Sequence, residues 1–309
     1  MPQKGMGVQV PPRTRSINVL RRYPSIMARG SWGQSKLLTQ KSWAIIKGNR
    51  YLLVFPVLGF VVSLLPLAAL WIPAGYLAVN NLNVPAVALA IVGLFANQMV
   101  LSVSGGGLVA AADVELSGGN SSLRHGLGRA FARIVPLLGW ALIATVVNVI
   151  VGFIRGRGGG AVDALRNLAA AGVLAMWQIV TFFVLPFIML EGRGPVIAIK
   201  ESFALFKAKW GVQIFGGVRI GGLIGLATVL PGVILVVLGF MFVFTDLAGV
   251  LALGIGMIAL GIVILMVGAL LITTMRGIFS VVLFRYAQTG TVEGGFTEAE
   301  LAGAIRTTA

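Results

Sequence analysis

Residues 51–79 read YLLVFPVLGFVVSLLPLAALWIPAGYLAV, and this stretch decides the fold. It contains no charged side chain and is longer than the roughly 20 residues that a helix needs to cross a bilayer. A lipid-exposed segment must be helical, because lipid offers no partner to a free backbone N–H or C=O group. The stretch therefore predicts a membrane-spanning helix, kinked by Pro56, Pro66 and Pro73.

Further apolar stretches follow, separated by short polar breaks. We expect six spans in all, over residues 51–79, 84–112, 134–154, 168–190, 212–244 and 247–274. The fold class is then an all-α membrane bundle of three helical hairpins. The fifth span is too long for one straight crossing at 1.5 Å per residue. Pro231 and Gly232 either kink it or end a shorter crossing that a re-entrant piece follows.

The composition supports a membrane protein and excludes several kinds of site. Hydrophobic residues make up 58% of the chain and charged residues 11%, against about 25% charged residues in soluble domains. The chain has no cysteine, which excludes disulfides, thiolate metal ligands and cysteine nucleophiles. His125 is the single histidine. We therefore expect no metal and no cofactor.

The net charge of +15 is distributed as membrane orientation would require. Twenty of the 24 Lys and Arg residues fall before the first span, in alternate loops or after the last span. The positive-inside rule places these regions and both termini in the cytoplasm, and we expect a multi-pass protein of the plasma membrane. Nucleic-acid binding is not expected, because no aromatic-basic interleaving or known nucleic-acid module accompanies the charge.

An internal repeat suggests how the spans are organised. Ser42-Trp-Ala-Ile-Ile-Lys47 aligns with Ser202-Phe-Ala-Leu-Phe-Lys207, and both lie just before a span. A weaker copy lies between them. We expect three units, over residues 33–112, 119–190 and 195–287, each an amphipathic helix followed by two spans. Residues 1–32 are then a basic, disordered tail and residues 288–309 a short cytoplasmic tail.

Two of the amphipathic helices show the same spacing. Leu123, Leu127, Ala130 and Ile134 lie at i, i+4, i+7 and i+11, and so do Ile199, Phe203, Phe206 and Trp210. Residues so spaced share one helix face. The opposite face would meet anionic lipid headgroups or a partner protein, or the helices would simply cap the bundle. The basic candidates for this binding are Arg124, Arg129, Arg133, Lys200, Lys207 and Lys209.

Arg219 lies inside the apolar run of the fifth span. A charge within a membrane is costly, so it marks either a polar site or a side chain that extends to the headgroups. Asp113 and Glu201 are its candidate acidic partners. Gly217, Gly221 and Gly225 flank it as a stripe of small residues, which indicates close packing against another helix or an oligomer contact.

Catalysis has little support in this sequence. It lacks a nucleophile elbow and paired carboxylates within the spans. An enzyme acting on a lipid would require a cleft that gathers Asp113, Glu115, His125 and Glu191, and it ranks last. Glu191 and Arg193 are close enough in sequence for a local ion pair.

Several short motifs carry a resemblance to a known family. They include Ser42-Trp43 before Leu52 to Pro56, Pro186 before Glu191-Gly-Arg-Gly-Pro195, and Trp210-Gly211. Over residues 33–286 the chain resembles an uncharacterised family of prokaryotic six-span membrane proteins, a domain of unknown function. That family is similar to the membrane-anchoring domain found with some glycerophosphodiester phosphodiesterases. The resemblance implies a fold and a membrane location and supplies no substrate. The phosphodiesterase activity does not carry over, because its metal-binding domain has no counterpart here.

Two functional hypotheses follow. In the first, a non-enzymatic membrane protein organises anionic lipid or partner proteins at the cytoplasmic face, where the partner is a membrane protein or a second copy of the chain. In the second, the chain is a channel or transporter for a small solute or ion, with a polar site near Arg219.

Overall fold

The computed structural model describes residues 50–155, 160–210, 222–244 and 248–290. Within these ranges the chain is helical and has no strand, which confirms the predicted all-α bundle. The two predicted tails, the Ser42–Lys47 copy of the repeat and Arg219 lie outside the described residues.

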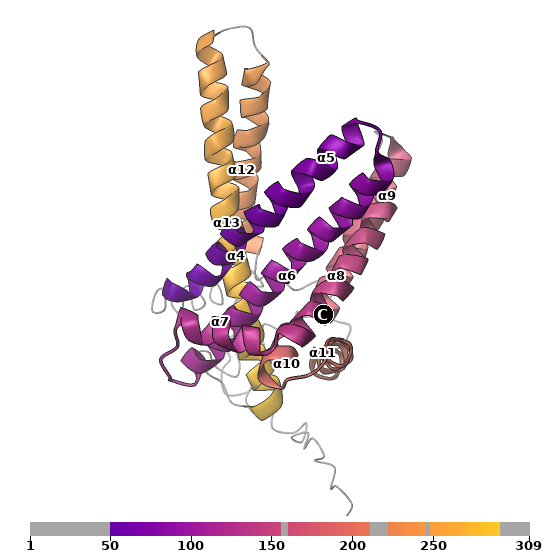
Figure 1. Cartoon of the computed structure of the whole chain (residues 1–309). Helices are drawn as coiled ribbons and strands as arrows, with labels where there is room; N and C mark the ends of the chain where they lie inside the picture. Colours follow the sequence, from indigo (N-terminus) through magenta and orange to yellow (C-terminus); the bar gives the residue numbers. More distant parts are fainter. Residues whose placement is uncertain (1–49, 156–159, 211–221, 245–247, 291–309) are drawn as a thin grey trace, which may run out of the picture.

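Three helical hairpins make up the bundle (Figure 1). The first pairs α4 (Val54–Pro66) and α5 (Ile72–Val79) with α6 (Asn83–Leu116). The second pairs α8 (Ile134–Ile154) with α9 (Ala161–Val180), and the third pairs α12 (Gly222–Val243) with α13 (Ala248–Thr289). The long α6 is central, since it contacts α4, α5, α7, α8, α10 and α13.

Length and composition make most of these helices able to cross a membrane. Five segments of the described chain qualify, namely Tyr51–Val79, Asn83–Leu116, Ile134–Ile154, Ala161–Leu190 and Val250–Thr289, and Thr228–Val243 is a shorter apolar helix. Five of the six predicted spans thus correspond to candidate membrane-crossing segments. Of the predicted fifth span, residues 222–243 form the helix α12, and 212–221 lie outside the described residues.

The observed helices differ from the predicted spans in three places. The fourth span starts seven residues earlier, at Ala161, and a turn at 181–183 separates α9 from α10 (Val184–Leu190). The fifth passes through Pro231 as continuous helix, so Pro231 and Gly232 do not end it. The sixth does not end at Thr274 but continues to Thr289. Arg276 and Arg285, predicted to follow the span, therefore lie within α13.

Of the three prolines predicted to kink the first span, Pro66 is followed by an irregular turn. After the 3₁₀ turn η1 (Arg50–Leu53), α4 runs to Pro66, and a wider π-helical turn, η2 (Leu67–Trp71), joins it to α5. Proline lacks the N–H that would continue the helical ladder, so the backbone adjusts at this point.

One end of the bundle, which we call the base, is densely packed. It comprises η1, α7 (Leu123–Ala132), α10, α11 (Pro195–Trp210) and the last four turns of α13, gathered at the lower end of Figure 1. The ten largest fully buried side chains of the described residues all belong to its core, together with parts of α4, α6 and α8: Leu52, Phe55, Leu108, Leu137, Phe183, Ile188, Met189, Met275, Ile278 and Phe279.

Glycines in α6 and α7 allow the closest approach within this core. A Cβ on Gly107 would lie 2.9 Å from the ring of Phe55, and one on Gly126 would lie 2.6 Å from the carbonyl oxygen of Gly107. The Gly105–Gly107 run therefore serves close packing and does not end the helix, which continues to Leu116.

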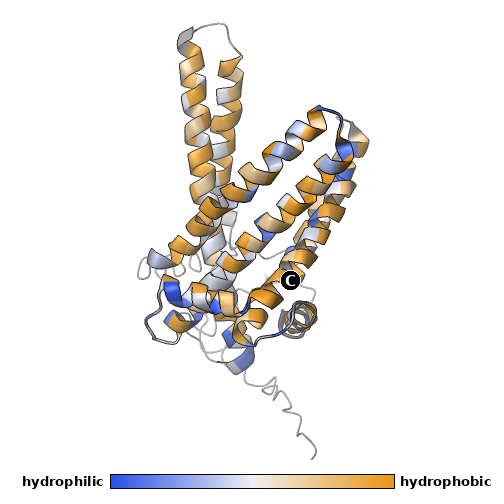
Figure 2. Cartoon of the chain, viewed as in Figure 1, coloured by the Kyte–Doolittle hydropathy of each residue, from blue (hydrophilic) through white to orange (hydrophobic). Residues whose placement is uncertain are grey.

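The α12–α13 hairpin diverges from the other helices above the base (Figure 1). Figure 2 shows apolar residues along both of its helices and hydrophilic residues gathered near the two ends of the bundle. Glycines bring its helices together: a Cβ on Gly239 would lie 2.7 Å from the Gly254 carbonyl oxygen, and one on Gly261 would lie 2.8 Å from that of Gly232. The seven-residue spacing repeats one contact every two turns.

Candidate lipid-facing site at the base

The helix α7 presents its basic residues outward because its apolar residues face the core. Ser122 caps it, with Oγ accepting a hydrogen bond from the His125 N–H at 3.1 Å. Leu123 and Leu127 pack against the core and Ala130 is fully buried. Arg124 and Arg129 are exposed on the other side of the helix, and Arg133 is exposed at its end.

The helix α11 is fixed at the break between α9 and α10. Ser202 is fully buried, donates a hydrogen bond to the Val180 carbonyl oxygen (2.5 Å) and accepts one from the Phe183 N–H (3.1 Å). Two otherwise unsatisfied backbone groups of the turn are thereby bonded.

The orientation of α11 corrects part of the predicted apolar face. Ile199 and Phe206 do pack against the core, but Phe203 is 50% exposed. Ala198, Ser202 and Leu205 face inward instead. Phe203 therefore lies on the outer face together with Lys200 and Lys207, both exposed. An aromatic side chain between two lysines is a pattern suited to a membrane interface.

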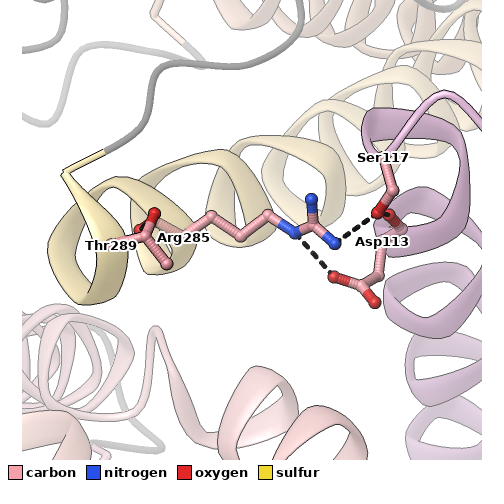
Figure 3. A network of polar contacts seen from close by, with 4 residues as sticks. All are labelled: Asp113, Ser117, Arg285 and Thr289. Atoms are coloured by element: carbon pink, nitrogen blue, oxygen red, sulfur yellow. Dashed lines mark hydrogen bonds and ion pairs between the residues drawn. The ribbon is translucent and has the colours of Figure 1, made fainter.

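The carboxylates of the base are bound to partners inside the protein. Figure 3 shows Arg285 of α13 reaching α6, where its Nε donates to Asp113 Oδ1 at 2.8 Å and its terminal nitrogen to Ser117 Oγ at 2.5 Å. Thr289, one turn further along α13, donates its hydroxyl to the Arg285 carbonyl oxygen at 2.9 Å. This ion pair joins the end of α13 to the end of α6.

Glu115 binds the start of the first hairpin. Its Oε1 accepts hydrogen bonds from the Tyr51 hydroxyl at 2.6 Å and from the Ser121 N–H at 2.7 Å. One carboxylate thus connects η1, α6 and the loop that leads into α7.

The remaining two acids meet at Arg193. Its Nε lies 3.2 Å from Glu191 Oε2, as the sequence predicted, and also 3.2 Å from Glu201 Oε2 on α11. Gln288 of α13 donates to the other oxygen of Glu191. The turn before α11 is therefore held to both α11 and α13.

Unlike these acids, the basic residues on the outer faces of α7 and α11 have no charged partner within the described part of the chain. No ion pair within the described part of the chain involves Arg124, Arg129, Arg133, Lys200 or Lys207. All five are exposed on the base. The Lys209 side chain lies outside the described residues. The base therefore presents positive charge that its own carboxylates, turned to internal contacts, do not neutralise.

The residues predicted for an intramembrane site are largely outside the described chain. Arg219, Gly217 and Gly221 lie there, and Gly225 is described only as part of the α12 backbone. The two proposed acidic partners of Arg219 have other contacts, Asp113 with Arg285 and Glu201 with Arg193.

Arg276, which was predicted to lie beyond the last span, lies within α13. Arg276 is exposed, and its terminal nitrogen donates a hydrogen bond to Gln178 Oε1 of α9 at 2.8 Å. The signal was present in the sequence, because the apolar segment Ile278 to Phe284 follows Arg276 and extends the helix.

Most polar side chains of the described spans bond to their own helix. Ser63, Ser102, Thr145, Asn148 and Thr274 each donate to the carbonyl oxygen four residues earlier. Such bonds satisfy the hydrogen-bonding donor of the side chain within its own helix, so the side chain does not require a polar cavity. In α6, by contrast, Asn97 Oδ1 is buried and has no hydrogen-bond partner among the described residues.

The four residues that a lipid-modifying enzyme would have to gather have separate roles. Asp113, Glu115 and Glu191 each bind a different partner, and the His125 backbone N–H belongs to the cap of α7. Among the described residues, no three His, Asp or Glu side chains are grouped as metal ligands would be.

Comparison with known proteins places the chain in a family. Residues 86–295 match the model of DUF6159, a family of unknown function. The match covers more than half of the chain, so the protein belongs to DUF6159. No curated protein and no solved structure matched, and the similarity to the anchoring domain of glycerophosphodiester phosphodiesterases received no support.

Proposed function

We propose that this member of DUF6159 is a non-enzymatic membrane protein that organises anionic lipid, and through it partner proteins, at the cytoplasmic face of the plasma membrane. The observation that supports this role is the charge imbalance of the base. Five exposed cations on or next to α7 and α11 lack ion pairs within the described chain, while Asp113, Glu115, Glu191 and Glu201 bind residues of the protein itself.

Anionic headgroups suit these cations better than a neutral surface would. Each Lys or Arg near an anionic leaflet contributes about 1 kcal/mol of attraction. Phe203, exposed between Lys200 and Lys207, supplies an apolar group that can enter the acyl boundary beside them.

The opposite end of the bundle has fewer charges. Arg155 and Arg166 are described there, and Arg166 lies 3.6 Å from Asp163. Under the positive-inside rule this difference supports a base that faces the cytoplasm. We expect a cysteine introduced at Gly128 to react with a membrane-impermeant maleimide only in opened cells, and one at Gly160 to react in intact cells. The chain has no cysteine of its own to confuse the labelling. The reverse pattern would refute the orientation.

The lipid role is tested by neutralising the cations. The variant with Arg124, Arg129, Arg133, Lys200 and Lys207 all changed to Gln is reconstituted in an equal mixture of phosphatidylglycerol and phosphatidylcholine. We expect the wild-type chain to retain an excess of phosphatidylglycerol in native mass spectrometry, decreasing as salt rises. The variant should lose most of this excess.

A matched control changes Arg155 and Arg166 to Gln at the other end. This variant should keep the phosphatidylglycerol excess, because its charges would face the other leaflet. An unchanged lipid preference in the five-residue variant would refute the proposed function.

A further inference from the structure

Arg276 is hydrogen-bonded to Gln178 and not to a carboxylate. Arg193 and Arg285 each contact a carboxylate, whereas the partner of Arg276 is a neutral amide, and no ion pair of Arg276 is found among the described residues. The positive charge of Arg276 therefore lacks a counter-charge within the described chain.

The lengths of two helices place this pair at the level of lipid headgroups. The 20 residues of α9 span about 30 Å, the thickness of the hydrocarbon core, and Gln178 lies two residues before its end. On α13, Arg276 lies about 40 Å along the axis from Ala248, which is more than the thickness of the hydrocarbon core.

An aromatic pair fixes α9 next to Gln178. Trp177 stacks on the buried Trp140 of α8 with ring centroids 5.7 Å apart. The lengths of α9 and α13 favour the level of phospholipid phosphates for the Arg276 guanidinium.

The helix faces above this pair leave space beside it. On α9, Ala164, Leu168, Ala171 and Ala175 precede Gln178 at helical spacing and are exposed. On α13, Ala269 and Thr273 precede Arg276 on the same face and are also exposed. Apart from Leu168, these side chains are small, and the α12–α13 hairpin diverges from the other helices above the base (Figure 1).

We propose that Arg276 and Gln178 form the headgroup site of one anionic phospholipid whose acyl chains lie between α9 and the α12–α13 hairpin. The guanidinium fork binds phosphate with two parallel hydrogen bonds. With Oε1 of Gln178 accepting from Arg276, the Gln178 amide N–H groups serve as further donors. This site is separate from the cations of α7 and α11, and it does not depend on their role.

The test measures binding of phosphatidylglycerol to the delipidated full-length chain in detergent by native mass spectrometry. We expect wild type to retain one tightly held lipid, and Arg276→Gln to weaken its binding at least about tenfold. Arg276→Lys keeps the charge and loses the fork, so its affinity should be intermediate. Equal retention by wild type and Arg276→Gln would overturn the proposal.

A second variant tests the acyl chains without touching the headgroup site. Ala171→Trp fills the space above Gln178 and should lower lipid retention while Arg276 stays in place. Unchanged retention in a folded Ala171→Trp protein would overturn the placement of the chains. Inorganic phosphate at 10 mM should not displace the lipid. Displacement by phosphate would assign the site to a free anion and would also overturn the proposal.

The variant Lys200→Gln/Lys207→Gln separates this site from the proposed function. It should keep the single tight lipid while reducing the general preference for phosphatidylglycerol. If it instead lost the tight lipid and Arg276→Gln did not, the tight site would belong to α11 and the Arg276 proposal would fail. If Arg276→Gln alone lost the lipid and general preference never changed, the proposed function would fail and this site would stand.

Discussion

The base and the α12–α13 hairpin hold their helices together by different kinds of contact. In the core of the base, large side chains such as Phe55 (on α4), Ile188 and Phe279 are almost completely removed from the surface. In the hairpin, backbones meet at Gly239 and Gly254, while large side chains such as Met241 and Leu253 stay exposed at 65% and 60%. The difference indicates the solvent of each region, because burying Leu or Met from lipid gains little, and close backbone packing then holds helices together.

The same contrast separates the polar groups. The base uses long-range ion pairs, such as that between Arg285 and Asp113, which join helices far apart in sequence. Within the spans, hydroxyl groups such as those of Ser63 and Thr145 bond to their own helix. A water-facing layer below a lipid-embedded layer accounts for both patterns.

The largest effect is expected from truncating the core of the base. Phe55→Ala removes a fully buried ring from the slot made by Gly107 and Gly126, and should cost about 3–5 kcal/mol in the free energy of unfolding. Denaturant unfolding in detergent micelles measures it.

Phe60→Ala on the same helix is the matched control. Phe60 is 40% exposed and should meet lipid or detergent in the folded state, so its loss should cost about 1 kcal/mol or less. Equal costs for the two variants would show that α4 is in the same environment at both positions, and the contrast between base and span would be lost.

A smaller effect is expected from separating the hairpin. In Gly254→Val, the new Cβ would lie 2.8 Å from the Gly239 carbonyl oxygen and 3.0 Å from the Val243 nitrogen, so the helices must move apart. Overpacking of this kind costs about 1–3 kcal/mol. Spin labels on cysteines introduced at Met241 and Leu253 should report a longer and broader distance distribution.

Gly256→Val provides the control for helix propensity. A Cβ on Gly256 meets nothing within 4 Å, so the same change of residue type two positions away should leave the distance distribution unchanged. If both variants opened the hairpin, valine in the helix would be the cause, and the glycine contacts would not be what holds α12 to α13.

The sequence predicts the spans because partition into lipid is a local property of 20 or so residues. Five of the six predicted spans correspond to segments able to cross a membrane, and the first of them has an irregular turn after Pro66. The predicted end of the sixth span, at Thr274, was wrong for a physical reason. Arg276 and Arg285 look like residues that end a span, but Gln178 and Asp113, about 100 and 170 residues away, hold them within the packed structure.

The phase of α11 could not be predicted for a related reason. The spacing of Ile199, Phe203 and Phe206 fits an apolar face, yet the helix is rotated so that Ser202 reaches the broken turn between α9 and α10. The Val180 carbonyl oxygen and the Phe183 N–H need partners, and their bonds to Ser202 set the rotation of α11. The sequence does not show where these two groups lie. The outward positions of Arg124 and Arg129 were predictable, because the apolar face of α7 is regular.

The smallest expected effect is the difference in coupling free energy between two ion pairs, one at each end of the bundle. The Arg285 and Asp113 side chains are each 21% exposed and 2.8 Å apart, and Ser117 adds a hydrogen bond. A double-mutant cycle with Arg285→Gln and Asp113→Asn should give a coupling of about 1 kcal/mol. The pair Arg166 and Asp163, at 3.6 Å with Arg166 61% exposed, should give about 0.3 kcal/mol in the matching cycle.

The coupling between Arg285 and Asp113 should also decrease less as salt is added, since these two charges are less solvated. Equal couplings with equal salt dependence would mean that the contact between α13 and α6 is an ordinary surface pair, and the extension of α13 would then depend on its apolar contacts alone.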